Sequence, residues 1–342
     1  CFRITSLSAT LAILPDPCSS MPRRFINQYG ERENISDIFL ASDKQLRTNK
    51  NGNLYLMMKL SDRMATITGM MGNANDQAYR MFENGDYVQI DGMTQFYNGN
   101  MQMIVNHVAK ASTNEVNEED FLQLAGADVE RMFARVAEIL RGMSSFPLRN
   151  LAECYLVDET IVSKFCAAPA GVKNHHAYRG GLLEHVLNLM EVVLAIAPRY
   201  PQLNQDLLLC GAFLHDLGKI DELHYDRDRG YTDEGQLIGH LVMGVTTLER
   251  KIKEAEELSG EQFPEELALQ LKHMIVSHHG QYEYGSPKLP MTLEAIALHH
   301  LDNLDAKIHS FLQIVDEDAN ADSIWTSFQP SLGRKLYKGE LG

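Results

Sequence analysis

The sequence has few of the residues that zinc modules and disulfide scaffolds require. Its 342 residues include only five cysteines, and no two of them form a Cys-x-x-Cys pair. An odd number of cysteines without paired spacing argues against a zinc ribbon or a disulfide framework, and it fits a reducing compartment. We therefore predict a cytoplasmic location.

Long apolar runs are also absent from the sequence. A membrane-spanning helix needs about 20 consecutive apolar residues, and no run approaches that length. Residues 11–14 form a weak apolar stretch, but only Arg3 precedes it and residues 15–17 make a poor cleavage site. We predict no association with a membrane and treat residues 1–20 as a tail of uncertain status.

Basic residues are outnumbered by acidic ones. The chain has 31 Lys and Arg against 46 Asp and Glu, which gives a net charge of −15. Residues 21–115 hold ten of each sign, whereas residues 116–342 hold 20 basic and 35 acidic residues. An acidic surface offers no non-specific attraction to a polyanion. Any binding of nucleic acid would therefore need local patches and stacking.

Apolar and polar residues alternate from residue 35 to about residue 110, which predicts short strands. Clear candidates are residues 54–60, 65–70, 87–92, 93–97 and 101–105, with a short helix near residues 76–82. The sequence Asn98-Gly99-Asn100 predicts a hairpin turn. Five or so strands with glycine corners suggest a small closed barrel of the OB type, which we place at residues 21–113.

Such a barrel is either a structural module or a platform for single-stranded nucleic acid. A platform stacks aromatic side chains on bases and tracks the backbone with Lys and Arg. Some aromatic residues must instead belong to the barrel core. The candidates for contacting a strand are Tyr55, Tyr87, Phe96 and Tyr97, with Lys59 and Arg63.

From about residue 114 the apolar spacing becomes helical. Helices are predicted at residues 128–143, 151–165, 182–197, 263–277 and 293–315, and another begins near His240. Thr292 is a reasonable N-cap for the last of them. We predict an all-α domain over residues 114–320 and a tail over residues 321–342. The fold class is therefore α+β, a barrel followed by helices.

Histidine and aspartate recur at core-facing positions in five of these segments. Burying ionisable side chains without partners costs several kcal/mol. One inward histidine is usually an ordinary hydrogen-bonded core residue, but five contributing segments predict a metal centre. The candidate ligands are His185, His215, Asp216, His240, His278, His279 and Asp302.

A ligand set of imidazole and carboxylate without thiolate favours Mn, Fe, Co, Ni or Mg over a structural zinc. Seven ligands exceed the needs of one ion, whereas two ions that share a carboxylate would use them well and could clamp a phosphoryl group. Lys219 follows Asp216 by three positions and His215 by four, so on a continuing helix it shares their face. It could neutralise charge on a phosphate; the alternative is a surface salt bridge.

Several blocks of the sequence are familiar in combination. Within residues 172–307, five blocks resemble the HD-domain metal-dependent phosphohydrolases: NHHAYRGGLLEH, LLLCGAFLHDLGKI, YTDEGQLIGH, SHHGQYEYGSPKLP and LHHLDNLDAK. With the OB-like segment before them and the ending WTSFQPSLGRKLYKG, residues 30–338 resemble the bacterial YhaM-type 3′–5′ exoribonucleases.

The resemblance implies a role for each matching residue. Ligands of a first metal would be His185, His215, Asp216 and Asp302, with Asp216 bridging to a second metal held by His240, His278 and His279. Lys219 would act in catalysis together with Asp216. His176 and Arg179 would contact the substrate phosphate.

The favoured hypothesis is a metal-dependent 3′–5′ exonuclease for single-stranded RNA, with DNA as a second candidate substrate. Two divalent ions are expected, Mn before Mg, Co, Fe or Ni, and a homo-oligomer is left open. The alternative is an HD hydrolase of free or cyclic nucleotides with a regulatory or assembly barrel. A non-catalytic nucleic-acid-binding protein is disfavoured because the ligand set is full.

Overall fold

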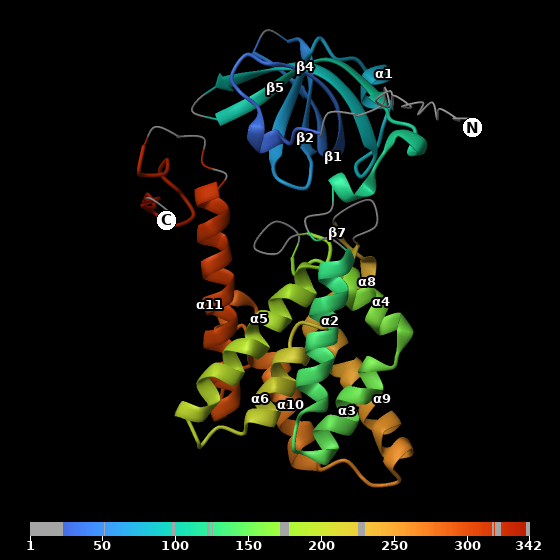
Figure 1. Ribbon diagram of the computed structural model, residues 1–342, viewed down its shortest axis with the longest axis vertical. Coiled ribbons are helices and arrows are strands. Elements are labelled where there is room, and N and C mark those ends of the chain that lie inside the picture. Colours follow the sequence, from blue (N-terminus) through green and yellow to red (C-terminus); the bar gives the residue numbers. More distant parts are fainter. Residues whose placement is uncertain are drawn as a thin grey trace, which may run out of the picture.

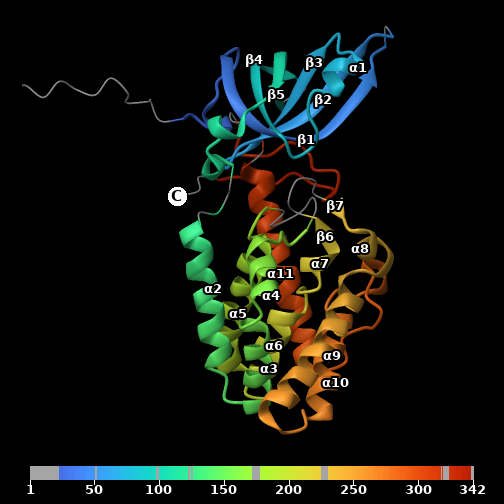
Figure 2. The same ribbon diagram turned by 90° about the vertical axis from the view of Figure 1, so that its right-hand side faces the viewer.

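The computed structural model describes residues 23–50, 52–97, 100–121, 124, 126–171, 178–224, 230–316, 318 and 323–339. A β-barrel is stacked on a helical body, and the C-terminal segment lies next to the end of the last helix, on the side of the molecule where the barrel sits (Figures 1 and 2). The predicted α+β class, an OB-like barrel followed by helices, is confirmed.

Five strands close the barrel in the order β1-β2-β3-β5-β4, and β4 pairs back to β1. Neighbouring strands are antiparallel except for β3 and β5, which are parallel. A short helix, α1, connects β3 to β4. The bounds are β1 Asn34–Thr48, β2 Leu54–Ser61, β3 Thr66–Gly72, α1 Asp76–Tyr79, β4 Tyr87–Tyr97 and β5 Asn100–Lys110.

Successive side chains along each strand point alternately into and out of the barrel, and the inward ones fill its interior. On β2, Leu56, Met58 and Leu60 are fully buried, while the residues between them face outward. The sequence divided β4 into two strands near Gly92, where the pairing with β5 does shift register, but the strand itself is continuous. The central residues of the predicted hairpin turn, 98 and 99, lie outside the described residues.

Helices form the second part of the molecule and pack around the buried helix α6. The bounds are α2 Gly126–Arg141, α3 Phe146–Leu156, α4 Glu159–Ala167, α5 Gly181–Ile196, α6 Gln205–Leu214, α7 Lys219–Glu222, α8 Asp233–Ile238, α9 His240–Ser259, α10 Glu265–Ser277 and α11 Leu293–Asp316. Two short strands, β6 Leu223–His224 and β7 Gly230–Tyr231, pair between α7 and α8.

Two helix caps show how side chains set helix boundaries. The helix predicted over residues 151–165 is in fact two helices, because the carboxylate of Asp158 accepts the backbone N–H groups of Thr160 and Ile161 and starts α4. The predicted cap at Thr292 is present, since its hydroxyl accepts the N–H of Ala295 at 3.1 Å.

Helix α5 is the most apolar of the long helices. The segment Gly181–Arg199 is long and apolar enough to cross a membrane by length and composition, with a mean hydropathy of 1.4. Core helices of soluble proteins pass the same test, and half of this segment is buried inside the protein. Because α5 also packs against α2, α4, α6 and α11, we interpret it as a central core helix.

Candidate metal centre

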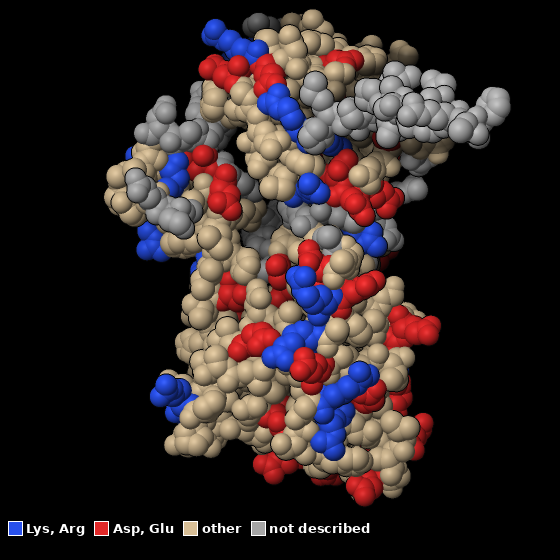
Figure 3. All heavy atoms as spheres, in the orientation of Figure 1, with Lys and Arg blue, Asp and Glu red and all other residues tan. Residues whose placement is uncertain are grey.

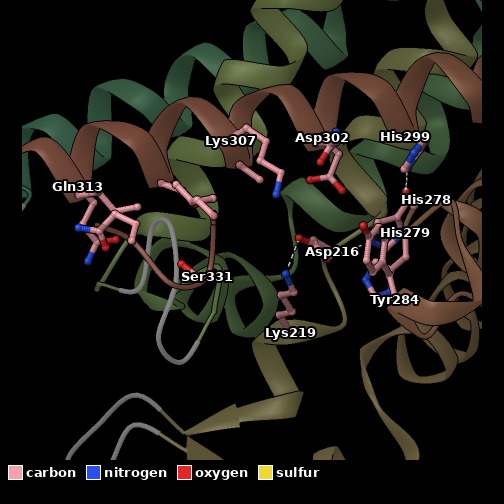
Figure 4. Close-up of a pocket in the computed structure, with 16 residues that line it drawn as sticks. Asp216, Lys219, His278, His279, Tyr284, His299, Asp302, Lys307, Gln313 and Ser331 are labelled. Atoms are coloured by element: carbon pink, nitrogen blue, oxygen red, sulfur yellow. Dashed lines mark hydrogen bonds and ion pairs between the residues drawn. The ribbon is translucent and has the colours of Figure 1, made fainter. Parts of the chain in front are cut away.

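The predicted ligands converge from separate helices on one buried cluster. His185 comes from α5, His215 and Asp216 from the turn after α6, and Asp302 from α11. His240 begins α9, and His278 and His279 follow α10. Four of these residues, His185, His215, Asp216 and His278, are no more than 3% exposed. Figure 4 shows how several of these residues face a common space.

A tight turn places the His215-Asp216 pair. Helix α6 ends at Leu214, and backbone hydrogen bonds from Leu217 to Leu214 and from Lys219 to Asp216 then span three residues each. The helix on which Lys219 would share a face with His215 and Asp216 therefore does not continue to Lys219. The turn nevertheless brings Nζ of Lys219 to 2.7 Å from Oδ2 of Asp216, and the lysine side chain is only 15% exposed.

A glycine lets this turn pack closely against the start of α9. A Cβ atom on Gly218 would lie 2.1 Å from the backbone oxygen of His240, which is closer than any side chain could tolerate. The missing side chain thus allows two ligand-bearing segments, with Asp216 on one and His240 on the other, to come together.

The two carboxylate oxygens of Asp216 face different histidines. Oδ2 lies 3.4 Å from Nε2 of His215 and 3.8 Å from Nε2 of His185. Oδ1 lies 3.5 Å from Nε2 of His240 and 3.4 Å from Nε2 of His278. One carboxylate therefore stands between two groups of imidazoles.

Backbone carbonyls fix the tautomer of two of these histidines. Nδ1 of His215 lies 2.8 Å from the oxygen of Ala212, and Nδ1 of His278 lies 2.8 Å from the oxygen of Ile275. A carbonyl oxygen can only accept, so each Nδ1 carries the proton and donates it. Each Nε2 then directs a lone pair into the cluster, as a metal ligand must.

Two carboxylates orient the other pair of histidines. Nδ1 of His185 lies 2.7 Å from Asp305, and Nδ1 of His240 lies 2.9 Å from Glu222. Such carboxylate–histidine pairs hold the ring and raise its basicity in metal sites. Neither role was predicted. Asp305 follows Asp302 by three residues and could have been found from helical spacing, whereas Glu222 has no signal in the sequence.

Charges in the cluster shift several pKa values. Burial opposes ionisation of Asp216, but Lys219 and His215 outweigh it and hold its pKa well below the usual range. Burial lowers the pKa of His278 to about 4, which keeps that ring neutral and able to bind a metal. Burial also opposes the charged form of His185, yet hydrogen bonds to Asp302 and Asp305 raise its pKa to about 9.

The donor set fits divalent metal ions. Oδ1 of Asp216, Nε2 of His240 and Nδ1 of His279 are buried and have no hydrogen-bond partner among the residues that the structure describes. Leaving such groups unsatisfied costs about 1–3 kcal/mol each, and metal coordination would satisfy the oxygen and Nε2. The ligand atoms fall into three overlapping groups within 4.8 Å: His185, His215 and Asp216; His215, His278 and Asp302; and His240, His278 and His279.

A cavity of about 720 Å³ opens beside the cluster. Asp216, Lys219 and Asp302 line its inner end together with His278 and His279 (Figure 4). Its outer part runs between one face of α11 and the C-terminal segment.

Comparison with known proteins places these residues in a family. The HD domain family matches residues 182–307, a span that contains all seven candidate ligands and Lys219. The 3′–5′ exoribonuclease YhaM of Bacillus velezensis is 36% identical over 81% of this chain and 86% of its own length. The YhaM proteins of Bacillus subtilis and a Geobacillus species are each 35% identical, over 83% and 82% of this chain and 88% and 84% of their own lengths.

The chain belongs to the YhaM family. The predicted resemblance is therefore confirmed, and so is the prediction of a hydrolase with an HD domain. An HD domain implies dependence on divalent metal, in agreement with the His and Asp groups of the cluster.

Of the other candidate residues of this YhaM family member, those that the structure describes are not part of the metal cluster. Arg179 is exposed just before α5, and its charge acts on Tyr87 of the barrel. The ring of Tyr87 packs at 4.8 Å against Phe121, which follows the barrel in the chain. His176 lies outside the described residues.

The barrel candidates face outward. Tyr55 is half-buried and Lys59 exposed, both on the outer side of β2, and Nζ of Lys59 lies 3.2 Å from the hydroxyl of Thr68. The Arg63 guanidinium lies 4.2 Å from the centre of the Phe25 ring. Near the end of β4, Phe96 is 42% and Tyr97 60% exposed. These side chains are accessible to a strand, but the structure does not bring them to the cluster.

Proposed function

We propose that the protein is a metal-dependent 3′–5′ exonuclease that hydrolyses single-stranded RNA through a dinuclear His/Asp centre. The observation that carries the proposal is the position of Asp216, whose two oxygens face two separate groups of histidines. The 3′–5′ direction of degradation and the RNA substrate are proposed from the names of the YhaM relatives.

In this proposal Asp216 bridges two metal sites. His185, His215 and Asp302 complete the first site. The second is completed by His240 and His278, which face the other oxygen, together with His279. The bound ions would stabilise charge on the phosphoryl oxygens and activate water. Imidazole and carboxylate ligands suit Mn, with Mg, Co, Fe or Ni as alternatives.

Lys219 is the proposed catalytic cation. Its ammonium group has three N–H donors, and two of them are used by Asp216 and by the backbone oxygen of Ala170, both at 2.7 Å. Because Lys219 also lines the cavity, the third donor is available to a phosphate oxygen. Glu222 and Asp305 are positioning residues, since they act through His240 and His185.

We assign binding of the RNA strand to the barrel. Phe96 offers exposed and Tyr55 partly exposed ring surface for stacking, and Lys59 and Arg63 offer charge. Arg179 is an exposed cation whose charge acts on Tyr87 of the barrel. On the face in Figure 3, Lys and Arg alternate with Asp and Glu over both parts of the molecule. Stacking and single cations, rather than a broad basic surface, would therefore hold the strand.

The proposal is tested with 5′-labelled single-stranded RNA in Mn²⁺ or Mg²⁺, beside DNA of the same sequence and duplex RNA. We expect labelled products that shorten progressively from the 3′ end on single-stranded RNA, and resistance of the duplex. Hydrolysis of free or cyclic nucleotides with oligomers left intact would instead support the alternative hydrolase with a regulatory barrel.

Two further properties are proposed. A homo-oligomer is supported by apolar side chains along one face of α11, where Leu304, Ile308 and Leu312 are 45–50% exposed. Size-exclusion chromatography with light scattering would detect it.

A cytoplasmic location is supported by Cys154, Cys166 and Cys210, which are free thiols. Fractionation of the source cells would test it.

A further inference from the structure

The cavity beside the metal cluster changes character along its length. Its carboxylates, those of Asp216 and Asp302, lie at the cluster, and no other described residue that lines it is acidic. This is unusual in a part of the chain that holds 35 acidic and 20 basic residues. Two walls form the outer part: Asn303, Lys307, Ser310 and Gln313 of α11 on one side, and Gln329 and Ser331 of the C-terminal segment on the other.

The cavity leads from the cluster toward the barrel. From the candidate ligand Asp302 to Ile314, its residues on α11 span about 18 Å at ~1.5 Å per residue. The C-terminal end of α11 lies beneath the barrel in both ribbon views (Figures 1 and 2). A strand held on the barrel could therefore reach the cluster along this face of α11.

The C-terminal wall is a folded segment. The backbone N–H of Thr326 donates to the oxygen of Leu336, and the N–H of Leu336 donates to the hydroxyl of Thr326. Leu336 is buried, and the Arg334 guanidinium lies 5.6 Å from the ring centre of Phe311 on α11. The hydrogen bonds fold the segment on itself, and the contact between Arg334 and Phe311 joins it to α11.

Lys307 is the cation of the outer cavity. It is exposed, and it has no hydrogen-bond or ion-pair partner among the described residues. Its side chain points from α11 into the space in front of Asp216 and Lys219 (Figure 4). The nearby carboxylate of Asp305 is engaged with His185. Apart from Asp216 and Asp302 at the cluster, no described residue that lines the cavity is acidic, so an unpaired ammonium group there is suited to a phosphate.

We propose that this cavity is the track for the 3′-terminal part of the substrate strand, with Lys307 binding a phosphate other than the one that is cleaved. Residues 323–339 form the wall that keeps the strand against α11. The inference rests on the proposed function and adds to it a binding site for a second part of the substrate. A cavity of about 720 Å³ lies within the ~300–1,000 Å³ typical of sites for drug-sized ligands, so it encloses only the end of a strand.

The test measures equilibrium binding of a short, fluorescently labelled single-stranded RNA in EDTA over a series of salt concentrations. Each phosphate contact contributes about 0.7 to the slope of log affinity against log salt for single strands. Lys307→Ala is expected to lower the slope by about 0.7 and to weaken binding about tenfold at low salt. Lys307→Arg should restore the slope. Lys253→Ala, an exposed lysine on α9, is the matched control and should change neither quantity.

A second pair of variants tests the wall. Ser331→Trp places a bulky ring in the cavity and should weaken RNA binding, whereas Ser327→Trp, an exposed position of the same segment outside the cavity lining, should not. Thermal unfolding would confirm that both variants remain folded.

The inference is overturned if Lys307→Ala keeps the wild-type slope and affinity, or if a folded Ser331→Trp variant binds RNA as the wild type does. Because binding is measured in EDTA, it is independent of hydrolysis. A wild-type protein that binds RNA through Lys307 but never shortens it would refute the proposed exonuclease and leave the track in place.

Discussion

The ammonium nitrogen of Lys219 lies 2.7 Å from Oδ2 of Asp216 and 2.7 Å from the backbone oxygen of Ala170. The sequence left open whether this lysine forms a surface salt bridge, and its 15% exposure excludes that reading. The Lys219 ammonium group instead favours the ionised form of the Asp216 carboxylate, which stands between two groups of histidines. It also places a cation at the inner end of the cavity.

Lys219→Ala is expected to keep the metal content and to lose turnover by about 10²–10³-fold, because one well-placed charge stabiliser is removed. Metal analysis and steady-state kinetics on RNA check this. Lys272→Ala is the control, since Lys272 pairs with Glu249 in another ion pair on α9 and α10. Unchanged turnover in the metal-loaded variant would reduce Lys219 to a structural ion pair.

Glu222→Ala is expected to weaken metal binding at the site that contains His240 by about 10–100-fold. The carboxylate accepts from both Nδ1 and the backbone N–H of His240, at 2.9 and 3.0 Å, so its loss frees the ring to rotate. Glu222→Gln retains an acceptor oxygen and should recover part of the affinity. Competition with a fluorescent chelator measures the affinity, and Glu234→Ala on α8 is an exposed control. Equal affinities in all variants would contradict the positioning role.

Gly280→Ala should disturb the cluster. Gly280 has a φ of +78°, and its Cβ would lie 2.1 Å from the ring of His299, whose Nδ1 donates to the backbone oxygen of His278. We expect a lower unfolding temperature and reduced metal content. Gly285→Ala isolates the backbone strain of about 1 kcal/mol or more, since Gly285 has a φ of +80° with nothing within 4 Å of its Cβ. Identical behaviour of the two variants would show that contact with His299 is unimportant.

Asp158→Ala should lower the free energy of unfolding by about 1 kcal/mol for the lost cap of α4, and by more because Lys251 loses a partner at 2.8 Å. The hydrogen bond to Lys251 lowers the pKa of Asp158, so its contribution is complete above the unfolded pKa near ~4 and fades as the pH falls through the folded value. Urea unfolding from pH 7 down to acid should show the deficit at neutral pH and its loss in acid. Asp128→Ala, at a more exposed ion pair with Arg131, is the control. A pH-independent deficit would argue against the ion pair.

Residue pattern alone predicted much of the fold and the cluster, because each depends on local periodicity. Inward positions of barrel strands and the helical faces of His185 and Asp302 follow from spacing. The break at Asp158 was missed since the apolar period continues across it, and only the cap interrupts the helix. Glu222 and the C-terminal wall reach the site through tertiary packing between segments distant in sequence, which no local pattern reports. The wall of Gln329 and Ser331 is the clearest case.

The central claim is that Asp216 bridges two metal ions, and metal analysis of the purified protein tests it most directly. After loading with Mn²⁺ and removal of free metal, the wild type should retain about two ions per chain, and Asp216→Ala should lose both, because each site contains one oxygen of that carboxylate. A single tightly bound ion in the wild type, or full occupancy in the Asp216→Ala variant, would contradict the dinuclear centre.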